Sequence, residues 1–255
     1  MIRLDNRRVL VTGASKGVGA AVAAALGRAG ARVVAHYGGD RAGAEEALAG
    51  VPGTHKRFVQ ADLHDLDATE ALWDAAQSAW DGIDVYVNNA AVMLWHGGFE
   101  SDKATWDAVW NDTLAVNVLA PARLMRRAVK HFRARRAGVL VTISSWAAQR
   151  GVTNPDTIAY AASKAAVRAA TQTIARAYAS EGLLAYIVAP GVVRTQMSEA
   201  FAATQGGEER INSTLAMGEW VPPQELGELV AFLASGRQRH LSGATLDVNG
   251  ATYLR

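Results

Sequence analysis

The sequence predicts an α/β fold in which a seven-stranded parallel sheet is flanked by helices on both faces. Two observations predict it. Short β-rich segments alternate with longer helical segments along the whole chain of 255 residues, which is the pattern of doubly wound sheets with right-handed crossovers. Several β segments, such as VLVT at 9–12, are apolar almost throughout, as expected of strands that helices cover on both faces.

The predicted strands, in chain order, are 8–12, 32–36, 57–61, 83–88, 139–144, 184–189 and 245–248. The predicted helices are 17–29, 41–49, 66–80, 102–136, 157–180 and 223–234, and their many alanines favour helix formation and close packing. No linker rich in proline, glycine or serine and no internal repeat interrupts this order. The chain is therefore predicted to be a single domain over 1–255.

Composition excludes several classes of protein. Hydrophobic residues make up 50% and charged residues 20% of the chain, which is typical of a folded globular protein. No apolar run approaches the ~20 residues that a membrane-spanning helix needs, and the first residues lack the apolar core of a secretion signal. The sequence has no cysteine, so disulfides and cysteine-bound zinc are excluded. These features predict a cytoplasmic protein without a membrane partner.

The charge pattern gives no indication of a nucleic-acid partner. The formal net charge is only +2, too small for a general attraction to phosphate backbones. A basic run is predicted to be a solvated helix face whose last residues favour the helix dipole; it comprises Arg123, Arg126, Arg127, Lys130, Arg133, Arg135 and Arg136. The histidines show no metal-binding spacing, so no metal site is predicted, and His96 is expected to be a surface or packed residue.

A glycine-rich loop joins the first strand to the first helix. In Thr12-Gly13-Ala14-Ser15-Lys16-Gly17-Val18-Gly19, Gly13 allows a tight turn, Gly17 lets the backbone approach a pyrophosphate, and Gly19 lets the helix pack closely on the strand. The helix N-terminus then offers free N–H groups to phosphates. An ordinary glycine-rich turn is the alternative, and the strand before and the helix after the loop argue against it.

A tyrosine and a lysine lie four residues apart in a predicted helix. Tyr160 and Lys164 therefore share one helix face. A phenol has a pKa of about 10, and a nearby ammonium group lowers it, which turns a tyrosine into a usable proton donor or acceptor. A packed ring beside a solvated lysine is the alternative interpretation.

Five motifs follow one another along the chain, four of them at the ends of predicted strands and one in a predicted helix. They are the glycine loop, Asn88-Asn89-Ala90-Ala91, Ser144-Ser145, the Tyr160/Lys164 pair and Pro190-Gly191. In this order they resemble the classical short-chain dehydrogenase/reductase family, and the resemblance covers essentially the whole chain. It implies a Rossmann-type dinucleotide-binding fold with no metal in the reaction.

The resemblance implies four catalytic residues. Tyr160 would be the general acid/base, Lys164 would lower its pKa and hold the nicotinamide ribose hydroxyls, and Ser145 would hydrogen-bond the substrate oxygen. Asn117 would hold a water that relays protons, or would plug a helix irregularity. Ser145 is favoured over Ser144 because the family uses the second serine of the pair and adjacent strand residues point to opposite faces. The spacing from Ser145 to Tyr160 is longer than usual, so 151–157 is expected to reshape one rim of the substrate cleft.

The resemblance also implies contacts with the cofactor and the substrate. Asp62 would accept a hydrogen bond from the adenine amino group, with a helix N-cap or turn role as the alternative. Asn89 would contact the adenosine ribose, and Val193 and Thr195 would hold the nicotinamide carboxamide. The full predicted cofactor set is Gly13, Ser15, Lys16, Gly17, Val18, Gly19, Tyr37, Asp62, Leu63, Asn89, Ala90, Tyr160, Lys164, Pro190, Gly191, Val193 and Thr195. Trp95, Trp146 and Met197 are predicted to line the substrate pocket, with a mobile lid near 196–217.

The second strand bears on the choice of cofactor. Members specific for NAD place an acidic residue at its end, where a carboxylate repels a 2′-phosphate. The corresponding position here is Tyr37 or its neighbour His36, and neither is acidic. Lys16 and Arg41 could bind a phosphate, while Asp40 argues for NAD. The sequence favours NADP(H), with NAD(H) as the alternative.

The predicted function is hydride transfer between NADP(H) and a small-molecule carbonyl compound or secondary alcohol. The alternatives are an NAD-dependent alcohol dehydrogenase of the same family and a dinucleotide-sensing protein without turnover. The helix 157–180 carries alanines at 161, 165, 169 and 175 that would let two helices approach closely. With the family's usual pairing of this helix, a homotetramer is expected, with a dimer as the second choice.

Overall fold

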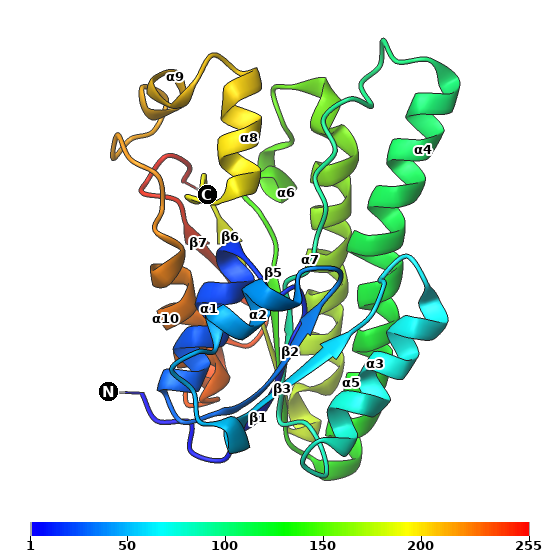
Figure 1. The fold of residues 1–255 in the computed structure, drawn as a ribbon, viewed down its shortest axis with the longest axis vertical. Helices are drawn as coiled ribbons and strands as arrows, with labels where there is room; N and C mark the ends of the chain where they lie inside the picture. Colours follow the sequence, from blue (N-terminus) through cyan, green and yellow to red (C-terminus); the bar gives the residue numbers. More distant parts are fainter. Residues whose placement is uncertain (1, 255) are drawn as a thin grey trace.

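The computed structural model describes residues 2–254 and confirms the predicted fold class (Figure 1). Seven parallel strands form one sheet: β1 (Arg8–Val11), β2 (Arg32–Tyr37), β3 (Lys56–Gln60), β4 (Val85–Asn88), β5 (Gly138–Ile143), β6 (Leu183–Pro190) and β7 (Thr245–Val248). Their order across the sheet is β3-β2-β1-β4-β5-β6-β7. The chain runs outward from β1 to β3 and then returns to β4 on the other side of β1. The strand order therefore reverses between β1 and β4.

Helices connect the strands and cover both faces. They are α1 (Gly17–Arg28), α2 (Arg41–Ala47), α3 (Leu66–Ser78), α4 (Lys103–Leu114), α5 (Ala120–Arg135), α6 (Ala147–Arg150), α7 (Ile158–Tyr178), α8 (Gln196–Thr204), α9 (Glu208–Asn212) and α10 (Pro223–Ala234). In residues 2–254 none of these helices combines the length and the apolar character needed to cross a lipid bilayer.

The sheet has a separate apolar core on each face because successive strand side chains point to opposite sides. On one face Val9 and Val11 of β1 pack with α1 and α10. On the other face Leu10 packs in a cluster that α3, α5 and α7 cover. The two helix layers lie on opposite sides of the sheet in Figure 1. Both faces being covered explains why the strands are apolar at consecutive positions.

The predicted long helix over 102–136 is interrupted. It consists of α4 and α5 joined by five π-helical residues, Ala115–Leu119, in which the Ala120 N–H donates to the Ala115 carbonyl. A π turn holds one residue more than an α turn and is not marked by any sequence pattern that periodicity detects. The short helix α6 was also not predicted, and the predicted lid segment contains α8 and α9.

The exposed alanine face of α7 differs from the predicted one. Ala161 and Ala175 are buried within the chain, at 7% and 4% exposure, so they cannot meet a second helix. Ala165 is half-buried and Ala169 is exposed. The exposed small residues on this helix include Ala162, Ala166 and Ala169, which follow the helical spacing of three and four. The prediction was wrong by one residue in phase over part of the helix.

Much of the basic run on α5 is paired with acidic side chains. Arg127 forms ion pairs with Glu70 and Asp74 of α3, and Arg123 lies 3.7 Å from Glu70. Arg133 pairs with Glu181 at 2.7 Å. The run therefore joins α5 to its neighbours in addition to facing solvent.

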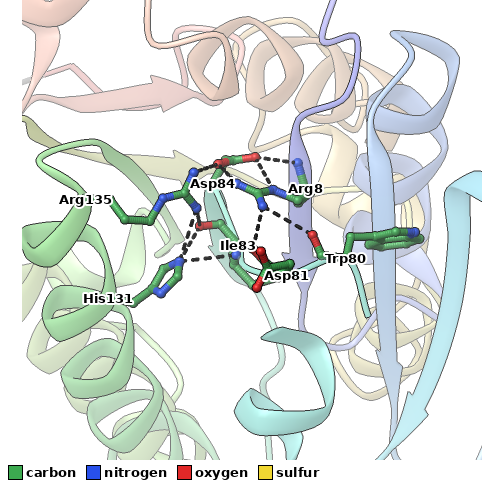
Figure 2. A network of polar contacts seen from close by, with 7 residues as sticks. All are labelled: Arg8, Trp80, Asp81, Ile83, Asp84, His131 and Arg135. Atoms are coloured by element: carbon green, nitrogen blue, oxygen red, sulfur yellow. Dashed lines mark hydrogen bonds and ion pairs between the residues drawn. The ribbon is translucent and has the colours of Figure 1, made fainter. Parts of the chain in front are cut away.

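An ionic network ties the amino-terminal ends of β1 and β4 to α5 (Figure 2). The Arg8 guanidinium donates two hydrogen bonds to the Asp84 carboxylate, at 2.8 and 2.6 Å, and the Arg8 backbone N–H donates a third at 3.0 Å. Arg135 of α5 lies 3.0 Å from the same carboxylate. Burial favours the neutral form of Asp84, but the Arg8 hydrogen bonds and the nearby charges outweigh it, so the pKa of Asp84 lies below its ordinary value.

Removing this carboxylate charge should destabilise the fold. Asp84→Asn is expected to lower the free energy of unfolding by about 2 to 3 kcal/mol, because Arg8 and Arg135 lose a shared partner in a largely buried position. Denaturant unfolding measures the effect. Asp74→Asn is the matched control: the Asp74 side chain is 61% exposed, so its loss should cost about 1 kcal/mol or less. Equal losses for the two variants would contradict the prediction.

The contribution of Asp84 should also depend on pH. A carboxyl group whose pKa is lower in the folded than in the unfolded chain stabilises the fold above the unfolded-state pKa, and this contribution disappears as the pH falls through the folded-state pKa. The stability difference between wild type and Asp84→Asn should be complete above about pH 5 and shrink below about pH 4. Unfolding curves across this range provide the measurement, and a difference that grows in acid would refute the assignment.

Candidate active site

A cleft of about 590 Å³ lies across the carboxyl ends of the strands. Doubly wound sheets bind ligands at this edge, where the strand order reverses. The glycine loop after β1 forms one part of its wall, and Ser145, Tyr160 and Lys164 form another. The fold thus brings together the two sets of residues that the sequence placed far apart.

Most predicted cofactor residues line this cleft. They are Gly13, Ser15, Lys16, Gly17, Val18, Gly19, Asp62, Leu63, Asn89, Ala90, Tyr160, Lys164, Pro190, Gly191, Val193 and Thr195. Tyr37 lies outside the lining and is 6% exposed, whereas its neighbour His36 is part of the wall. The wall also includes Gly38, Gly39, Asp40, Ala61, His64, Ala91, Val92, Val116, Ile143, Ser144, Gln196 and Ser198. Apart from Val116, which lies in the π-helical segment, they lie at or after the carboxyl ends of strands, which is the signal that could have found them.

The glycine loop leaves no room for side chains. Gly13 and Gly17 have positive φ angles of 66° and 55°, which favour glycine. A Cβ on Gly19 would lie 1.9 Å from the Gly13 carbonyl oxygen, and a Cβ on Gly17 would lie 3.0 Å from Thr195 Cγ2. Lys16 precedes α1 without making a side-chain cap, so the first N–H groups of the helix remain available to an anion.

Hydrogen bonds fix the glycine loop to the end of β4. The Thr12 hydroxyl accepts from the backbone N–H groups of Asn89 and Ala90, at 3.1 and 3.2 Å. The Asn89 side-chain amide donates to the carbonyls of Thr12 and Gly13, at 2.8 and 3.1 Å. The Asn89 amide group therefore holds the loop in place, a role that its predicted ribose contact did not include.

His36 joins the glycine loop to the end of β3. Its Nδ1 lies 3.1 Å from the Gly13 backbone nitrogen and its Nε2 lies 3.1 Å from the Ala61 carbonyl oxygen. The Gly13 N–H must donate to Nδ1, so the ring hydrogen lies on Nε2 and is donated to Ala61. Burial lowers the pKa of His36, which favours the neutral ring that this pattern requires.

The Tyr160 ring and the Lys164 ammonium group lie near each other in the cleft wall. Lys164 Nζ is 5.7 Å from the Tyr160 ring centre and donates to the Ile143 carbonyl at 2.9 Å. Burial lowers the pKa of Lys164 to about 8. Burial also raises the pKa of Tyr160, and a hydrogen bond with Ser145 offsets only part of this. This direction is opposite to the predicted lowering, because burial disfavours the charged phenolate.

The two adjacent serines have different partners. The Ser144 hydroxyl donates to the Lys164 main-chain carbonyl at 3.0 Å. The Ser145 hydroxyl accepts from the Ala147 N–H at 3.2 Å and is hydrogen-bonded with Tyr160. Both serines are largely buried and both line the cleft. The hydroxyl of Ser144 is thus occupied by the backbone of α7, and that of Ser145 lies beside Tyr160.

Asn117 lies in the π-helical turn, and its side chain braces the cleft wall from behind. Its Oδ1 accepts from the Val92 N–H, and its Nδ2 donates to the Val92 carbonyl, both at 2.8 Å. The second Nδ2 hydrogen is donated to Ser163 Oγ at 3.0 Å. Both amide hydrogens are therefore used, and only acceptor oxygens of this residue remain for the predicted water. The helix irregularity that the sequence left open is present.

Three charged residues that follow β2 and β3 have defined partners. Asp40 accepts from the Gly43 N–H at 2.9 Å and caps α2, and Arg41 pairs with Glu45 at 2.8 Å. Asp62 accepts from the backbone and the ring of His64. It is therefore a turn residue, while Asp65 caps α3. Lys16 is exposed and takes part in no ion pair found in residues 2–254.

The predicted substrate residues lie in three places. Met197 lines the cleft. Trp95 contacts Phe201 of α8, with 6.3 Å between the ring centres. The backbone N–H of Trp146 donates to the Pro190 carbonyl at 2.9 Å. Residues of the long segment 151–157 line a second, apolar hollow of about 410 Å³ beside α6 and α7 rather than the main cleft.

Backbone hydrogen bonds join the residues just before the predicted lid segment to those just after it, and an ion pair links the first of these parts to α9. The Val221 N–H donates to the Val192 carbonyl at 2.8 Å, and the Arg194 N–H donates to the Val221 carbonyl at 3.0 Å. The Arg194 side chain also pairs with Glu208 at 2.7 Å and lies over Trp220. The segment between these contacts carries α8 and α9 beside the cleft.

These features fit a dinucleotide. The cleft is long enough to join the glycine loop to Tyr160, the loop glycines let a pyrophosphate approach the backbone, and the N-terminus of α1 has uncapped N–H groups. Within residues 2–254, no group of three or more histidine, aspartate or glutamate side chains is placed to hold a metal ion. The side chains that line the cleft include the hydroxyl of Ser145, the phenol of Tyr160 and the ammonium group of Lys164.

Known proteins of similar sequence and structure agree with this geometry. The profile of a family described as enoyl-(acyl carrier protein) reductase matches residues 13–251. The chain is 34% identical over 254 residues to 3beta-hydroxysteroid dehydrogenase 1 of Eggerthella lenta, covering 98% of this chain and 95% of that protein.

Two of the solved structures that are similar to this chain contain a bound nucleotide. One is described as an NAD(P)-dependent gluconate 5-dehydrogenase from Beutenbergia cavernae with NADP; it is 32% identical, with a TM-score of 0.87 and 98% of each chain covered. The other is a variant of actinorhodin polyketide ketoreductase with NADPH; it is 28% identical, with a TM-score of 0.86 and 99% of each chain covered. The chain belongs to the short-chain dehydrogenase/reductase family of NAD(P)-dependent oxidoreductases that act on CH–OH and C=O groups.

Proposed function

We propose that this protein is an NADP(H)-preferring reductase of an uncharged ketone. The observation that carries the proposal is the cluster of Ser145, Tyr160 and Lys164 in the same cleft as the glycine loop. The nicotinamide ring supplies or accepts the hydride. Tyr160 would exchange the proton with the substrate oxygen, and Ser145 would donate a hydrogen bond to the same oxygen.

The proton chemistry of Tyr160 favours reduction. A phenol whose pKa is raised by burial is neutral near pH 7 and carries the proton that a ketone oxygen must receive. Lys164 would hold the ribose hydroxyls, and its pKa of about 8 lets it exchange a proton near neutral pH. Asn117 would keep the wall behind Tyr160 in place through Val92 and Ser163.

The cleft lining supports an uncharged substrate. Its charged side chains other than Lys164 come from the loops that follow β1, β2 and β3, namely Lys16, Asp40 and Asp62. Apolar residues such as Val92, Val116 and Met197 belong to the rest of the wall. An ionised substrate would find no opposite charge there apart from Lys164. The segment 196–217 would act as the lid over this substrate.

The contacts of the adenosine end support NADP(H). The Asp40 carboxylate is occupied by the α2 cap, which weakens the argument that it binds the ribose of NAD. Lys16 is exposed in the cleft wall and would pair with a 2′-phosphate. An NAD-dependent alcohol dehydrogenase with the same catalytic residues remains the alternative.

Tyr160→Phe should abolish most turnover and leave cofactor binding intact, because only the hydroxyl is removed. We expect kcat to fall by about 10² to 10⁴-fold, with cofactor affinity unchanged, in an absorbance assay with a panel of ketones. Tyr178→Phe is the matched control, since Tyr178 ends the same helix and stacks on Arg133. Retention of more than about a tenth of the wild-type kcat by Tyr160→Phe would refute the assignment.

Lys16→Ala should lower kcat/KM for NADPH by about tenfold or more and change kcat/KM for NADH little, because a phosphate contact is lost. Steady-state kinetics with both cofactors measure this. Lys103→Ala is the control, since Lys103 lies on α4 and pairs with Asp107. Equal efficiency of the wild type with NADH and NADPH would overturn the predicted preference, as would equal losses in Lys16→Ala.

We also propose that the chain forms a homotetramer, with a dimer as the second choice, in which the exposed alanine face of α7 contacts a second copy. Light scattering should give a mass near four times the chain mass of 27.0 kDa. Ala166→Arg should lower this mass, while Ala49→Arg, at another exposed alanine, should not. A wild-type mass near 27.0 kDa at micromolar concentration would contradict both assemblies.

A further inference from the structure

His36 lies in the cleft wall and contacts two other segments of that wall. It is the penultimate residue of the buried strand β2, is only 2% exposed and is one of the residues that line the cleft. Its imidazole contacts two other segments of the wall, the glycine loop at Gly13 and the end of β3 at Ala61. Its own carbonyl accepts from the Ala14 N–H at 2.9 Å. A single residue therefore connects the ends of β1, β2 and β3.

The hydrogen-bonding capacity of this ring is used up. A neutral imidazole has one acceptor nitrogen and one donor N–H. The acceptor receives the Gly13 N–H and the donor is given to the Ala61 carbonyl, both at 3.1 Å. The ring therefore retains neither a donor nor an acceptor for a nucleotide in the cleft.

The two segments that His36 joins hold most of the predicted adenosine contacts. Ser15 and Lys16 follow Gly13 in the loop, and Asp62 and Leu63 follow Ala61. The separation of Gly13 from Ala61 thus sets the distance between the loop that would hold the pyrophosphate and the residues that would hold the adenine. Besides the β1–β2 and β2–β3 ladders, the Ala14 N–H bond to the His36 carbonyl and the Ala61 N–H bond to the Tyr37 carbonyl also fix this distance. The imidazole adds a direct link between Gly13 and Ala61.

We propose that His36 is a positioning residue for the dinucleotide, which holds the glycine loop and the end of β3 at a fixed separation through its Nε2-protonated ring without contacting the cofactor itself. This inference rests on the proposed function, since it assumes that a nicotinamide dinucleotide lies in the cleft. Because His36 touches neither the 2′-hydroxyl nor the 2′-phosphate, it acts equally on NADPH and NADH. Lys16, by contrast, acts on one of them.

The experiment compares cofactor dissociation constants, measured by calorimetry with NADPH and with NADH, for wild type, His36→Asn and His36→Leu. Leu removes both hydrogen bonds and should raise Kd about tenfold or more for both cofactors by the same factor. Asn retains an acceptor oxygen close to the Nδ1 position but has no donor that reaches the Ala61 carbonyl, so it should restore only part of the affinity. At saturating cofactor, kcat should stay within about threefold of wild type, because the catalytic residues are unchanged.

Val34→Ala separates positioning from a general loss of stability. Val34 is fully buried on the same strand and the same face, one pleat before His36, and it does not line the cleft. This variant should lower the melting temperature without changing either Kd. An equal rise in Kd for Val34→Ala and His36→Leu would overturn the proposal. A rise for only one cofactor in His36→Leu would also overturn it, because that indicates direct contact with the 2′ substituent.

A measurement on the wild type keeps the proposal testable even if the His36 variants fail to fold. The long-range proton–nitrogen NMR spectrum should show the His36 ring hydrogen on Nε2 near neutral pH. A hydrogen on Nδ1, or a doubly protonated ring, would overturn the proposal because Gly13 could not then donate to Nδ1. Failure of the wild type to bind either cofactor would overturn the proposed function itself, which distinguishes the two outcomes.

Discussion

The close approach of the glycine loop to the end of β4 is the constraint on which the cleft depends. Thr12 and Asn89 exchange hydrogen bonds across the point where the strand order reverses. A Cβ on Gly13 would come within 2.9 Å of Ala90 Cα. Any widening at this point would separate the glycine loop from Ser145, Tyr160 and Lys164 in the same cleft. The hydrogen bonds of Asn89 and the absence of a side chain at Gly13 therefore act together.

The two ends of the sheet are stabilised by different means. The amino-terminal end is held by the shared carboxylate of Asp84, whose partners Arg8 and Arg135 come from β1 and α5. The carboxyl-terminal end uses uncharged hydrogen bonds between the backbone and Thr12, Asn89, His36 and Asn117. The charged side chains that line the cleft, Lys16, Asp40, Asp62 and Lys164, take no part in these contacts. The strong charges that stabilise the fold lie at the far end of the strands.

The sequence predicted those features that local patterns encode. Strand apolarity identified the sheet, and glycine spacing identified the loop, because each depends on neighbours along the chain. The role of His36 could not be predicted in this way, since its partners Gly13 and Ala61 lie on two other segments. The pKa direction of Tyr160 was missed for a related reason. The number of atoms packed around a hydroxyl is a property of the folded chain, and here burial has the largest effect on the pKa of Tyr160.

The sequence also did not identify which face of α7 is exposed. Nine of the 21 residues of this helix are alanine, so composition alone does not identify which alanines face solvent. Burial of Ala161 and Ala175 fixes the phase. Ser145 and Tyr160 could be predicted from their motifs. Ser145 follows a strand and Tyr160 lies in the first turn of a helix, and the doubly wound topology fixes the orientation of both elements. The structure places the two side chains side by side.

The π-helical turn between α4 and α5 has a consequence for how this chain tolerates changes in length. The wider turn at Ala115–Leu119 accommodates one residue more than an α-helical turn, so α4 and α5 keep nearly the phase of one continuous helix. Deleting a single residue here would therefore produce one regular helix without turning α4 relative to α5. The turn that carries Asn117 would be lost, however, and with it the position of the amide group between Val92 and Ser163. A shortening that leaves the two helices intact would thus act on the wall of the cleft alone.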